Sequence, residues 1–290
     1  MMLPEKNITE ILSIELLIMN NQCSPDVDDN LTCFTYDQLK SIAKKYNTKN
    51  KNDKIVISRT KKDLWNSIQQ KMKYSCDDEK CWADGDKSMM KRFRPNKPNE
   101  WDSNPRTWLS NFDIQDVMMQ YEKKYKTFKF IGVFPNNYDD KVFMNLCVSE
   151  ELCNLDITEL ITKGKYQLGI VFNTDPHWSS GSHWVAVYIG ISEKYSKKFG
   201  FFYYDSNAEK PSAYISKLYE QVKMQMSKIT QKQFDLHINN RRHQFKNTEC
   251  GMFSMNFIIN MLDRKRDFQS IINDKVYDDK VFKLRDIFYD

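Results

Sequence analysis

The sequence predicts an α+β fold in which helices pack on a central mixed sheet, preceded by a mainly helical region. Over the second two thirds of the chain, short runs rich in β-branched and aromatic residues alternate with longer amphipathic segments. Three prolines within residues 94–105 separate these segments from a basic first third. The 290 residues are 40% hydrophobic. Because no apolar run reaches about 18 residues, we expect a soluble globular protein without a membrane-spanning helix.

Two capped helices are expected in the first hundred residues. One follows Thr35, where Gln38 completes a capping box, and the other follows Thr60. Ahead of them, residues 8–19 also have a helical pattern, and the N-terminus lacks the basic-then-apolar order of a secretion signal. We therefore expect residues 1–100 to form a helical N-terminal arm domain and residues 101–290 to form the core domain.

The segment from Lys40 to Lys73 is strongly basic. It holds eleven Lys and Arg residues against Asp53 and Asp63, a local charge of +9, whereas the whole chain carries +5. Helix, basic link and helix in this order weakly resemble the SAP-type motif of DNA-associated proteins. A phosphate-contacting surface for nucleic acid is one interpretation. The other, favoured by the usual behaviour of charge runs, is a solvated basic face, with or without an acidic scaffold protein docked on it.

The core elements follow from periodicity and flanking residues. Strands are expected where aromatic and β-branched residues form short runs, and helices where apolar residues recur at three- and four-residue spacing. A helix capped by Ser212 places Leu218 and Val222 on one face. In chain order, the expected elements are a helix at residues 114–124, strands at 128–134, 166–172, 183–189 and 199–204, a helix at 213–228, a strand at 234–238 and a helix at 251–262.

Cys250 is the candidate nucleophile. It precedes Gly251 and the apolar segment 252–262, which places it on the first turn of a buried helix. Unpaired N–H groups and the positive end of the helix dipole favour thiolate over thiol at such a position. Taken alone, a cysteine before a glycine at a helix start is more often a small buried residue.

His183 and Asp205 are the candidate partners of that thiol. His183 is one of four histidines and opens a β-rich run, whereas Asp205 follows the next such run. Two adjacent strand ends that face the start of a helix have the nucleophile, base and orienter geometry of thiol catalysis. Each residue alone has an ordinary interpretation, as a structural histidine or a turn aspartate. Together with Gln244, six positions before Cys250, they form a specific pattern.

The whole pattern resembles a known family. His-Trp at 183–184, Tyr-Asp-Ser at 204–206 and Gln-x5-Cys-Gly at 244–251 are similar to the cysteine peptidases that process SUMO-like modifiers and to their viral relatives, including the adenovirus maturation protease. Residues 168–175 and 242–251 look, more narrowly, like the polyprotein-processing proteases of African swine fever virus and other large cytoplasmic DNA viruses. The resemblance runs from Thr107 to Asp290 and implies a papain-like-superfamily core.

The resemblance implies a role for each residue of the pattern. Cys250 would be the nucleophile, His183 the general base and Asp205 the residue that orients the imidazole. Gln244 would supply one donor of the oxyanion hole, and the backbone N–H of Cys250 the other. The orienter of the swine fever enzyme is an Asn, so Asp205 follows the SUMO-protease pattern. A carboxylate stabilises a charged imidazolium more strongly than a neutral amide does.

Two tryptophans are expected to bind substrate. Trp108 and Asn111 lie in a segment similar to the Trp-Leu-Asn-Asp segment of SUMO proteases, and Trp184 follows the candidate base. In that family the two indoles sandwich a Gly-Gly dipeptide in a tunnel too narrow for larger side chains. The alternative is that both indoles are core or rim aromatics, since tryptophan is commonly half buried.

Three functions remain as expectations. The first is an endopeptidase that cleaves viral structural polyproteins after small residues, at Gly-Gly-Xaa sites, during virion maturation. The second is an isopeptidase that removes ubiquitin-like modifiers from host proteins. The third is a nucleic-acid- or scaffold-binding protein with a vestigial peptidase site. The complete catalytic set argues against the third.

Cysteine usage bears on compartment and metal binding. Seven cysteines are an odd number at low density, which favours a reducing compartment. We therefore expect the protein in the host cytoplasm and in the virion. Cys76 and Cys81 lack a second Cys or His pair at metal-ligand spacing, so neither a zinc site nor a cofactor is expected.

Overall fold

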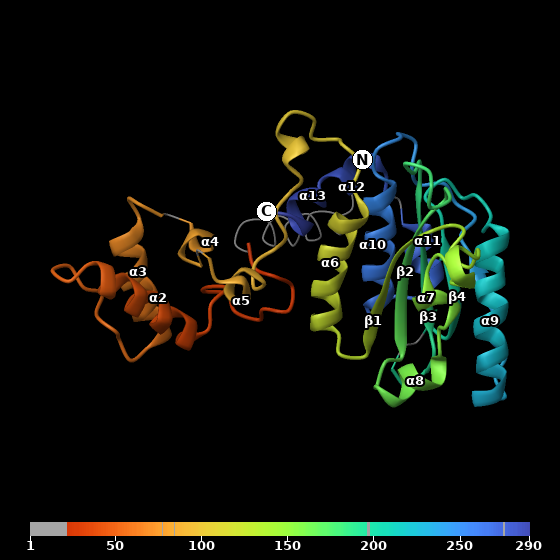
Figure 1. Ribbon diagram of the computed structural model, residues 1–290, viewed down its shortest axis with the longest axis horizontal. Coiled ribbons are helices and arrows are strands. Elements are labelled where there is room, and N and C mark those ends of the chain that lie inside the picture. The colour runs from red at the N-terminus through yellow and green to blue at the C-terminus, as the bar shows by residue number, and fades with distance from the viewer. Residues whose placement is uncertain (1–21, 77, 84, 196–197, 275) are drawn as a thin grey trace, which may run out of the picture. The chain divides into compact units, whose positions relative to one another are not determined.

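The computed structural model describes residues 22–76, 78–83, 85–195, 198–274 and 276–290 as an α+β protein (Figure 1). Contacts divide it into two units, Met1–Asn96 with Asp286–Asp290, and Lys97–Arg285. The helical pattern at residues 8–19 lies outside the described residues. Within the described ranges, no helix is both long and apolar enough to cross a membrane.

The first unit contains the two helices that the sequence predicts. α2 (Tyr36–Lys49) begins at the capping box of Thr35 and Gln38, and α3 (Lys61–Met72) begins at Thr60. Each cap side chain accepts a backbone N–H that the helix itself leaves unpaired. Because these signals are local, the helix starts were readable without tertiary information.

Two short helices and a shared core complete the first unit. α4 (Glu79–Trp82) and α5 (Lys87–Met90) follow α3. The last five residues group with this unit, where the Asp290 N–H donates to the Pro95 carbonyl at 3.0 Å. The large buried side chains of the unit pack in one hydrophobic cluster, which includes Phe34, Leu39, Leu64, Ile68, Trp82 and Phe93.

The second unit is built on a five-stranded mixed sheet in the order β1-β2-β3-β4-β5. The first two strands are parallel, the third is antiparallel to both its neighbours, and the last two are parallel. This confirms the predicted α+β class. The strands are β1 (Phe128–Pro135), β2 (Gln167–Asn173), β3 (Trp184–Gly190), β4 (Gly200–Tyr204) and β5 (Leu236–Ile238).

Helices cover both faces of the sheet. α6 (Asn111–Lys124) and α10 (Cys250–Leu262) lie on one face, and α9 (Ala213–Ile229) lies on the other (Figure 1). α10 is buried over most of its surface because it lies between the sheet and other helices, which explains its almost entirely apolar sequence. α6 starts three residues before the predicted helix, since Ser110 and Asp113 form a capping box.

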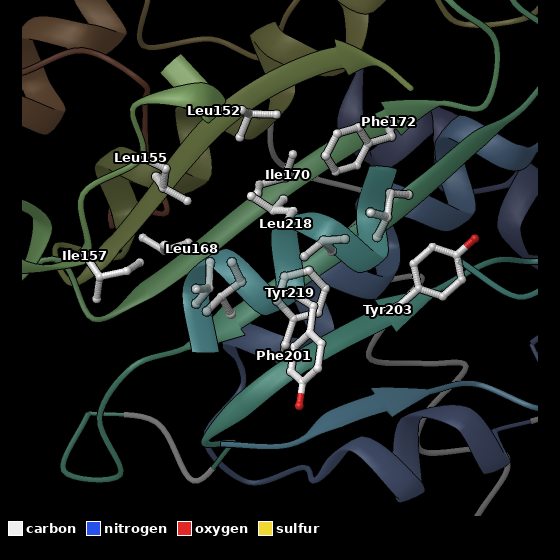
Figure 2. Packing of buried hydrophobic residues seen from close by; sticks show 14 of the residues in the cluster. Leu152, Leu155, Ile157, Leu168, Ile170, Phe172, Phe201, Tyr203, Leu218 and Tyr219 are labelled. Carbon is white, nitrogen blue, oxygen red and sulfur yellow. The ribbon is translucent and has the colours of Figure 1, made fainter. Parts of the chain in front are cut away.

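The face under α9 forms the main hydrophobic core. Figure 2 shows side chains of α9, such as Leu218, directed at residues of β2 and β4, such as Ile170 and Phe201. All three side chains are fully buried. Truncation of such a residue, for example Leu218→Ala, typically costs about 2–5 kcal/mol of stability.

The remaining elements are short and connect these layers. The predicted strand at 234–238 shrinks to the three residues of β5 at the edge of the sheet. The remaining helices are η1 (Asn99–Asp102), η2 (Phe143–Asn145), α7 (Glu150–Cys153), α8 (Ile157–Thr162), α11 (Phe268–Asn273), α12 (Asp278–Phe282) and α13 (Arg285–Phe288).

Six of the seven cysteines are paired in disulfides. The bonds join Cys23 to Cys33, Cys76 to Cys81 and Cys147 to Cys153, and Cys250 is the free thiol. The partners are 10, 5 and 6 positions apart, so local turns bring the sulfurs together. The number of cysteines in the sequence does not reveal such turns. The expectation of a reducing compartment rested on the odd number and low density of the cysteines. Because six of them are paired, that argument no longer supports it, and the compartment stays a prediction.

Candidate active site

The sheet places His183 and Asp205 at adjacent ends of two neighbouring strands. His183 immediately precedes β3, and Asp205 immediately follows β4. Since these strands are antiparallel, the start of one lies beside the end of the other. The His183 Nε2 atom lies 2.7 Å from Asp205 Oδ1. Nε2 is thus occupied by the carboxylate, which leaves Nδ1 as the ring nitrogen for another partner.

The Cys250 thiol is the other side chain that acts on the ring, since its hydrogen-bonding and charge interactions raise the pKa of His183 together with those of Asp205. Cys250 is the first residue of α10 and is 2% exposed. Burial lowers the pKa of His183, but the hydrogen bonds to Asp205 and Cys250 outweigh it and raise the pKa from 6.5 to about 9. At neutral pH the imidazole is therefore protonated, which favours a thiolate beside it.

Asp205 is held by its own neighbours. Its carboxylate is 2% exposed and also accepts the Asn207 N–H at 2.7 Å. The buried Asn239 side chain bonds to both backbone groups of Asp205. It accepts the Asp205 N–H at 2.8 Å and donates to the Asp205 carbonyl at 2.7 Å. The sequence analysis missed Asn239. The available signal was a polar residue directly after the predicted strand at 234–238, which pairs with the strand that delivers Asp205.

Gln244 lies beside the same strand ends. Its backbone N–H donates to the Ser206 carbonyl at 2.9 Å, and the Ser206 hydroxyl donates to Gln244 Oε1 at 2.6 Å. Because Oε1 accepts this bond, the amide Nε2 remains as the donor end of the side chain. Both residues are buried. Ser206 belongs to the recognised sequence pattern, but its orienting contact was not anticipated.

The start of α10 packs tightly on the tryptophan segments. A Cβ atom at Gly251 would lie 3.2 Å from Leu109 Cδ1 and 3.3 Å from Trp184 Cδ1, closer than nearly all real contacts. Trp184 donates its indole N–H to the Leu109 carbonyl at 3.1 Å. Trp184 and the residue after Trp108 therefore meet beside Cys250, and a larger residue at position 251 would require the Leu109 and Trp184 side chains to shift.

The exposed substrate candidates remain predictions. Trp108 is 41% exposed. Asn111 is exposed on the first turn of α6. Half-burial of Trp184 and exposure of Trp108 fit rim aromatics as well as substrate contacts.

The other three histidines have different surroundings. His243 is buried between the Tyr204 hydroxyl, 2.8 Å from Nδ1, and the Ile272 carbonyl, 3.0 Å from Nε2, and burial lowers its pKa. His237 stacks on Phe202, and His177 bonds to Asn137. Among the four histidines, His183 is the one that meets the free thiol.

Comparisons with known proteins identify relatives of this chain. The thiol protease of Acanthamoeba polyphaga mimivirus is 30% identical over 93% of each chain. A protein of African swine fever virus named a SUMO-1 cysteine protease is 25% identical over 80% of this chain and 90% of that protein. The crystal structure of the African swine fever virus protease superposes with a TM-score of 0.66 at 20% identity, over 92% of this chain and 95% of that one.

The relatives and the fold together define a cysteine protease. Within this class, the chain belongs to the family of viral thiol proteases that includes the mimivirus and African swine fever virus enzymes. Residues 114–283 also match the family model described as YopJ Serine/Threonine acetyltransferase. The cysteine protease that the sequence pattern predicts is thus confirmed.

Proposed function

We propose that this protease cleaves viral structural polyproteins after small residues, with Gly-Gly-Xaa as the preferred site, during virion maturation in the host cytoplasm and the virion. The observation that carries the proposal is the close packing of Trp184 and Leu109 on Gly251, beside the nucleophile. If the substrate passes between Trp184 and Trp108, as the resemblance to SUMO proteases implies, it has little room for side chains. Small residues before the scissile bond follow from that restriction.

The residues of the site supply the chemistry. The Cys250 thiolate attacks the scissile carbonyl carbon, and the carbonyl oxygen takes the negative charge. Gln244 Nε2 and the Cys250 N–H stabilise that oxyanion. His183 then donates its proton to the leaving amine as the C–N bond breaks, leaving a thioester. His183, now neutral, takes a proton from water, and the hydroxide adds to the thioester carbonyl. The C–S bond then breaks, which releases the carboxylic acid product and restores the Cys250 thiolate beside protonated His183.

An isopeptidase that acts on ubiquitin-like modifiers is the main alternative. It would use identical chemistry, and the African swine fever virus relative carries the name SUMO-1 cysteine protease. Such modifiers end in Gly-Gly, so the same restriction at Trp184 accommodates them. The difference between the two functions lies in which protein presents the small residues.

Acyl transfer is a second alternative, favoured by the family model that residues 114–283 match. A thioester on Cys250 can be attacked by a serine or threonine hydroxyl instead of water. The acyl group would then come from a donor such as a thioester cofactor. Hydrolysis is preferred here because the relatives that align over most of the chain are named as proteases.

One set of assays distinguishes these three functions. The wild-type protein and Cys250→Ala are incubated with the viral core polyprotein, with SUMO and ubiquitin precursors, and with acetyl-coenzyme A plus a Ser/Thr-rich protein. New termini and acetyl groups are located by mass spectrometry. We expect cuts after Gly-Gly in the polyprotein that depend on Cys250. Cleavage of the modifiers alone, or acetylation without cleavage, would replace the proposal with the corresponding alternative.

The basic segment from Lys40 to Lys73 is proposed to dock the enzyme on nucleic acid or an acidic scaffold. Its support is the two helices with their extended link. Several of its lysines pair with aspartates within the unit, among them Lys40 with Asp37. Such pairs reduce the positive charge offered to a partner, so a salt-sensitive and moderate affinity is expected.

A further inference from the structure

The segment from Gln244 to Cys250, here named the catalytic loop, carries the proposed oxyanion donor and the nucleophile at its two ends. Between them the chain has no helix or strand. An irregular segment cannot satisfy its own backbone groups through regular bonding, so other parts of the protein must do so. The residues that bond to this loop therefore set the distance between donor and nucleophile.

Asp278 holds the first end of the catalytic loop. Its Oδ2 accepts the Phe245 N–H at 2.9 Å, and its Oδ1 accepts the Lys246 N–H at 3.0 Å. These are the two backbone groups directly after Gln244. Asp278 is 5% exposed, so the carboxylate that anchors these exposed loop residues is itself buried. A carboxylate that accepts two N–H groups is a strong, directional anchor.

Arg285 holds the second end through Glu249, the residue before Cys250. Arg285 Nε lies 2.9 Å from Glu249 Oε2, and their side chains are 3% and 0% exposed. Arg285 Nη1 also donates to the Thr107 carbonyl at 3.0 Å, directly before Trp108. The guanidinium lies 4.2 Å from the centre of the Trp101 ring. One side chain thus links the nucleophile's neighbour to the tryptophan segment.

A buried ion pair of this kind is poor evidence for stability. The desolvation of two charges offsets most of their attraction, and apolar replacements are often as stable. The Glu249 carboxylate and the Arg285 guanidinium are 0% and 3% exposed and lie next to the proposed nucleophile. The fixed geometry that they impose on it explains this burial better than stability does. Figure 1 shows α12, which Asp278 begins, beside α10.

We infer that Asp278 and Arg285 are positioning residues that act as a clamp on the two ends of the catalytic loop. The clamp keeps the Gln244 amide and the Cys250 N–H at the spacing that the oxyanion requires. The inference rests on the proposed roles of Gln244 and Cys250. It adds residues from the C-terminal part of the second unit to the machinery of hydrolysis. A shift of about 1 Å in such a donor costs on the order of 10²-fold in rate.

The test compares Asp278→Asn with Asp279→Asn in the full-length protein. Asp279 is the next residue of α12, but its carboxylate pairs with the Lys246 side chain at 2.6 Å rather than with the backbone. We expect Asp278→Asn to lower kcat by about 10- to 100-fold with little change in KM, since oxyanion stabilisation acts in the transition state. Asp279→Asn should stay within about twofold of wild type, as for most surface substitutions.

A second readout separates geometry from folding. Iodoacetamide alkylates Cys250 at a rate that depends on the thiolate and its folded surroundings but needs no oxyanion hole, whereas the hemithioacetal formed with N-acetylglycinal does. Asp278→Asn should leave the alkylation rate unchanged and weaken aldehyde binding by about 10-fold or more. Because neither reagent depends on the natural substrate, this result stands apart from the polyprotein proposal. Equal aldehyde affinity and equal kcat per alkylated site in Asp278→Asn and Asp279→Asn would overturn the clamp.

Arg285→Lys tests the other end. Lysine keeps the charge but loses the fork that reaches Glu249 and the Thr107 carbonyl together. We expect aldehyde binding to fall, and KM to rise as well, because the segment before Trp108 loses its anchor. If Arg285→Lys folds, alkylates normally and binds the aldehyde like wild type, Arg285 has no positioning role.

Discussion

His183 and Asp205 form the fixed part of the site, with 2.7 Å between Nε2 and Oδ1 across 22 residues of sequence. The carboxylate is 2% exposed and receives a further backbone N–H from Asn207. A carboxylate restrained in this way holds the imidazole in one orientation and leaves Nδ1 as the ring nitrogen for the thiol. The reactivity of Cys250 therefore depends on both residues.

Replacing Cys250 or His183 by Ala is expected to abolish cleavage while the fold persists. The two residues act as a unit, so the double variant should be no slower than either single variant. The measurement is kcat/KM on a cleaved peptide, alongside thermal unfolding. His237→Ala is the matched control, because that ring stacks on Phe202 away from the thiol. Near-native cleavage by either catalytic variant would remove the assignment.

Asp205→Asn is expected to be slower than wild type but faster than Asp205→Ala. An amide still accepts a hydrogen bond and orients the ring, but it cannot balance an imidazolium. The comparison is kcat for the three proteins at one pH. A rate for Asp205→Asn no higher than that of Asp205→Ala would mean that charge, not orientation, is what Asp205 supplies.

Gln244→Ala should lower kcat by about 10²-fold with little change in KM, the typical effect of losing one oxyanion donor. Ser206→Ala should have a smaller effect in the same direction, since Ser206 only orients the amide through its 2.6 Å bond to Oε1. Steady-state kinetics of both variants make the test. A raised KM at constant kcat would assign Gln244 to substrate binding instead.

Activity should fall on the alkaline side as His183 loses its proton. The pKa of His183 is raised from 6.5 to about 9. A raised histidine pKa contributes stability that is complete below about pH 6.5 and is lost as pH rises through about 9. The alkaline limb of kcat should follow the same group and shift to lower pH in Asp205→Asn. An alkaline limb unchanged by that substitution would contradict the assignment.

Removal of residues 1 to 100 is expected to spare cleavage of a short Gly-Gly-Xaa peptide and to impair processing of the polyprotein. The basic charges between Lys40 and Lys73 lie in the first unit, and the candidate catalytic residues lie in the second. Peptide and polyprotein turnover are compared for both proteins, with DNA binding at low and moderate salt. Loss of peptide cleavage in a soluble, folded truncation would show that the first unit is part of the active enzyme.

The design of that truncation has to include the C-terminus. Asp286–Asp290 group with the first unit, through contacts such as Lys80 with Asp290 at 2.8 Å. Truncation at residue 100 leaves these contacts without partners. A second truncation that also ends after Arg285 keeps the buried pair with Glu249 and removes the orphaned residues.

Local signals in the sequence were sufficient to predict several helices of the structure. The caps at Thr35, Thr60 and Ser212 mark the starts of α2, α3 and α9, because a cap bonds to N–H groups within three residues of it. The order of the four candidates was also readable, since His183, Asp205 and Cys250 flank recognisable apolar runs and Gln244 stands six positions before Cys250. The structure brings His183 together with both Asp205 and Cys250.

Contacts between distant segments were decided only by the tertiary structure. Three hydrogen bonds join residues that are 34, 33 and 36 positions apart, namely Asn239 with Asp205, Asp278 with Phe245 and Arg285 with Glu249. Asn239 follows a predicted strand, but the sequence around Asp278 and Arg285 carries no sign of a partner, because a buried charged side chain looks like any polar loop residue until the chain is folded. The sequence by itself determined the fold class and the pattern of candidate catalytic residues. Folding decided what holds those residues in place, since desolvation and hydrogen-bond geometry exist only in the packed protein.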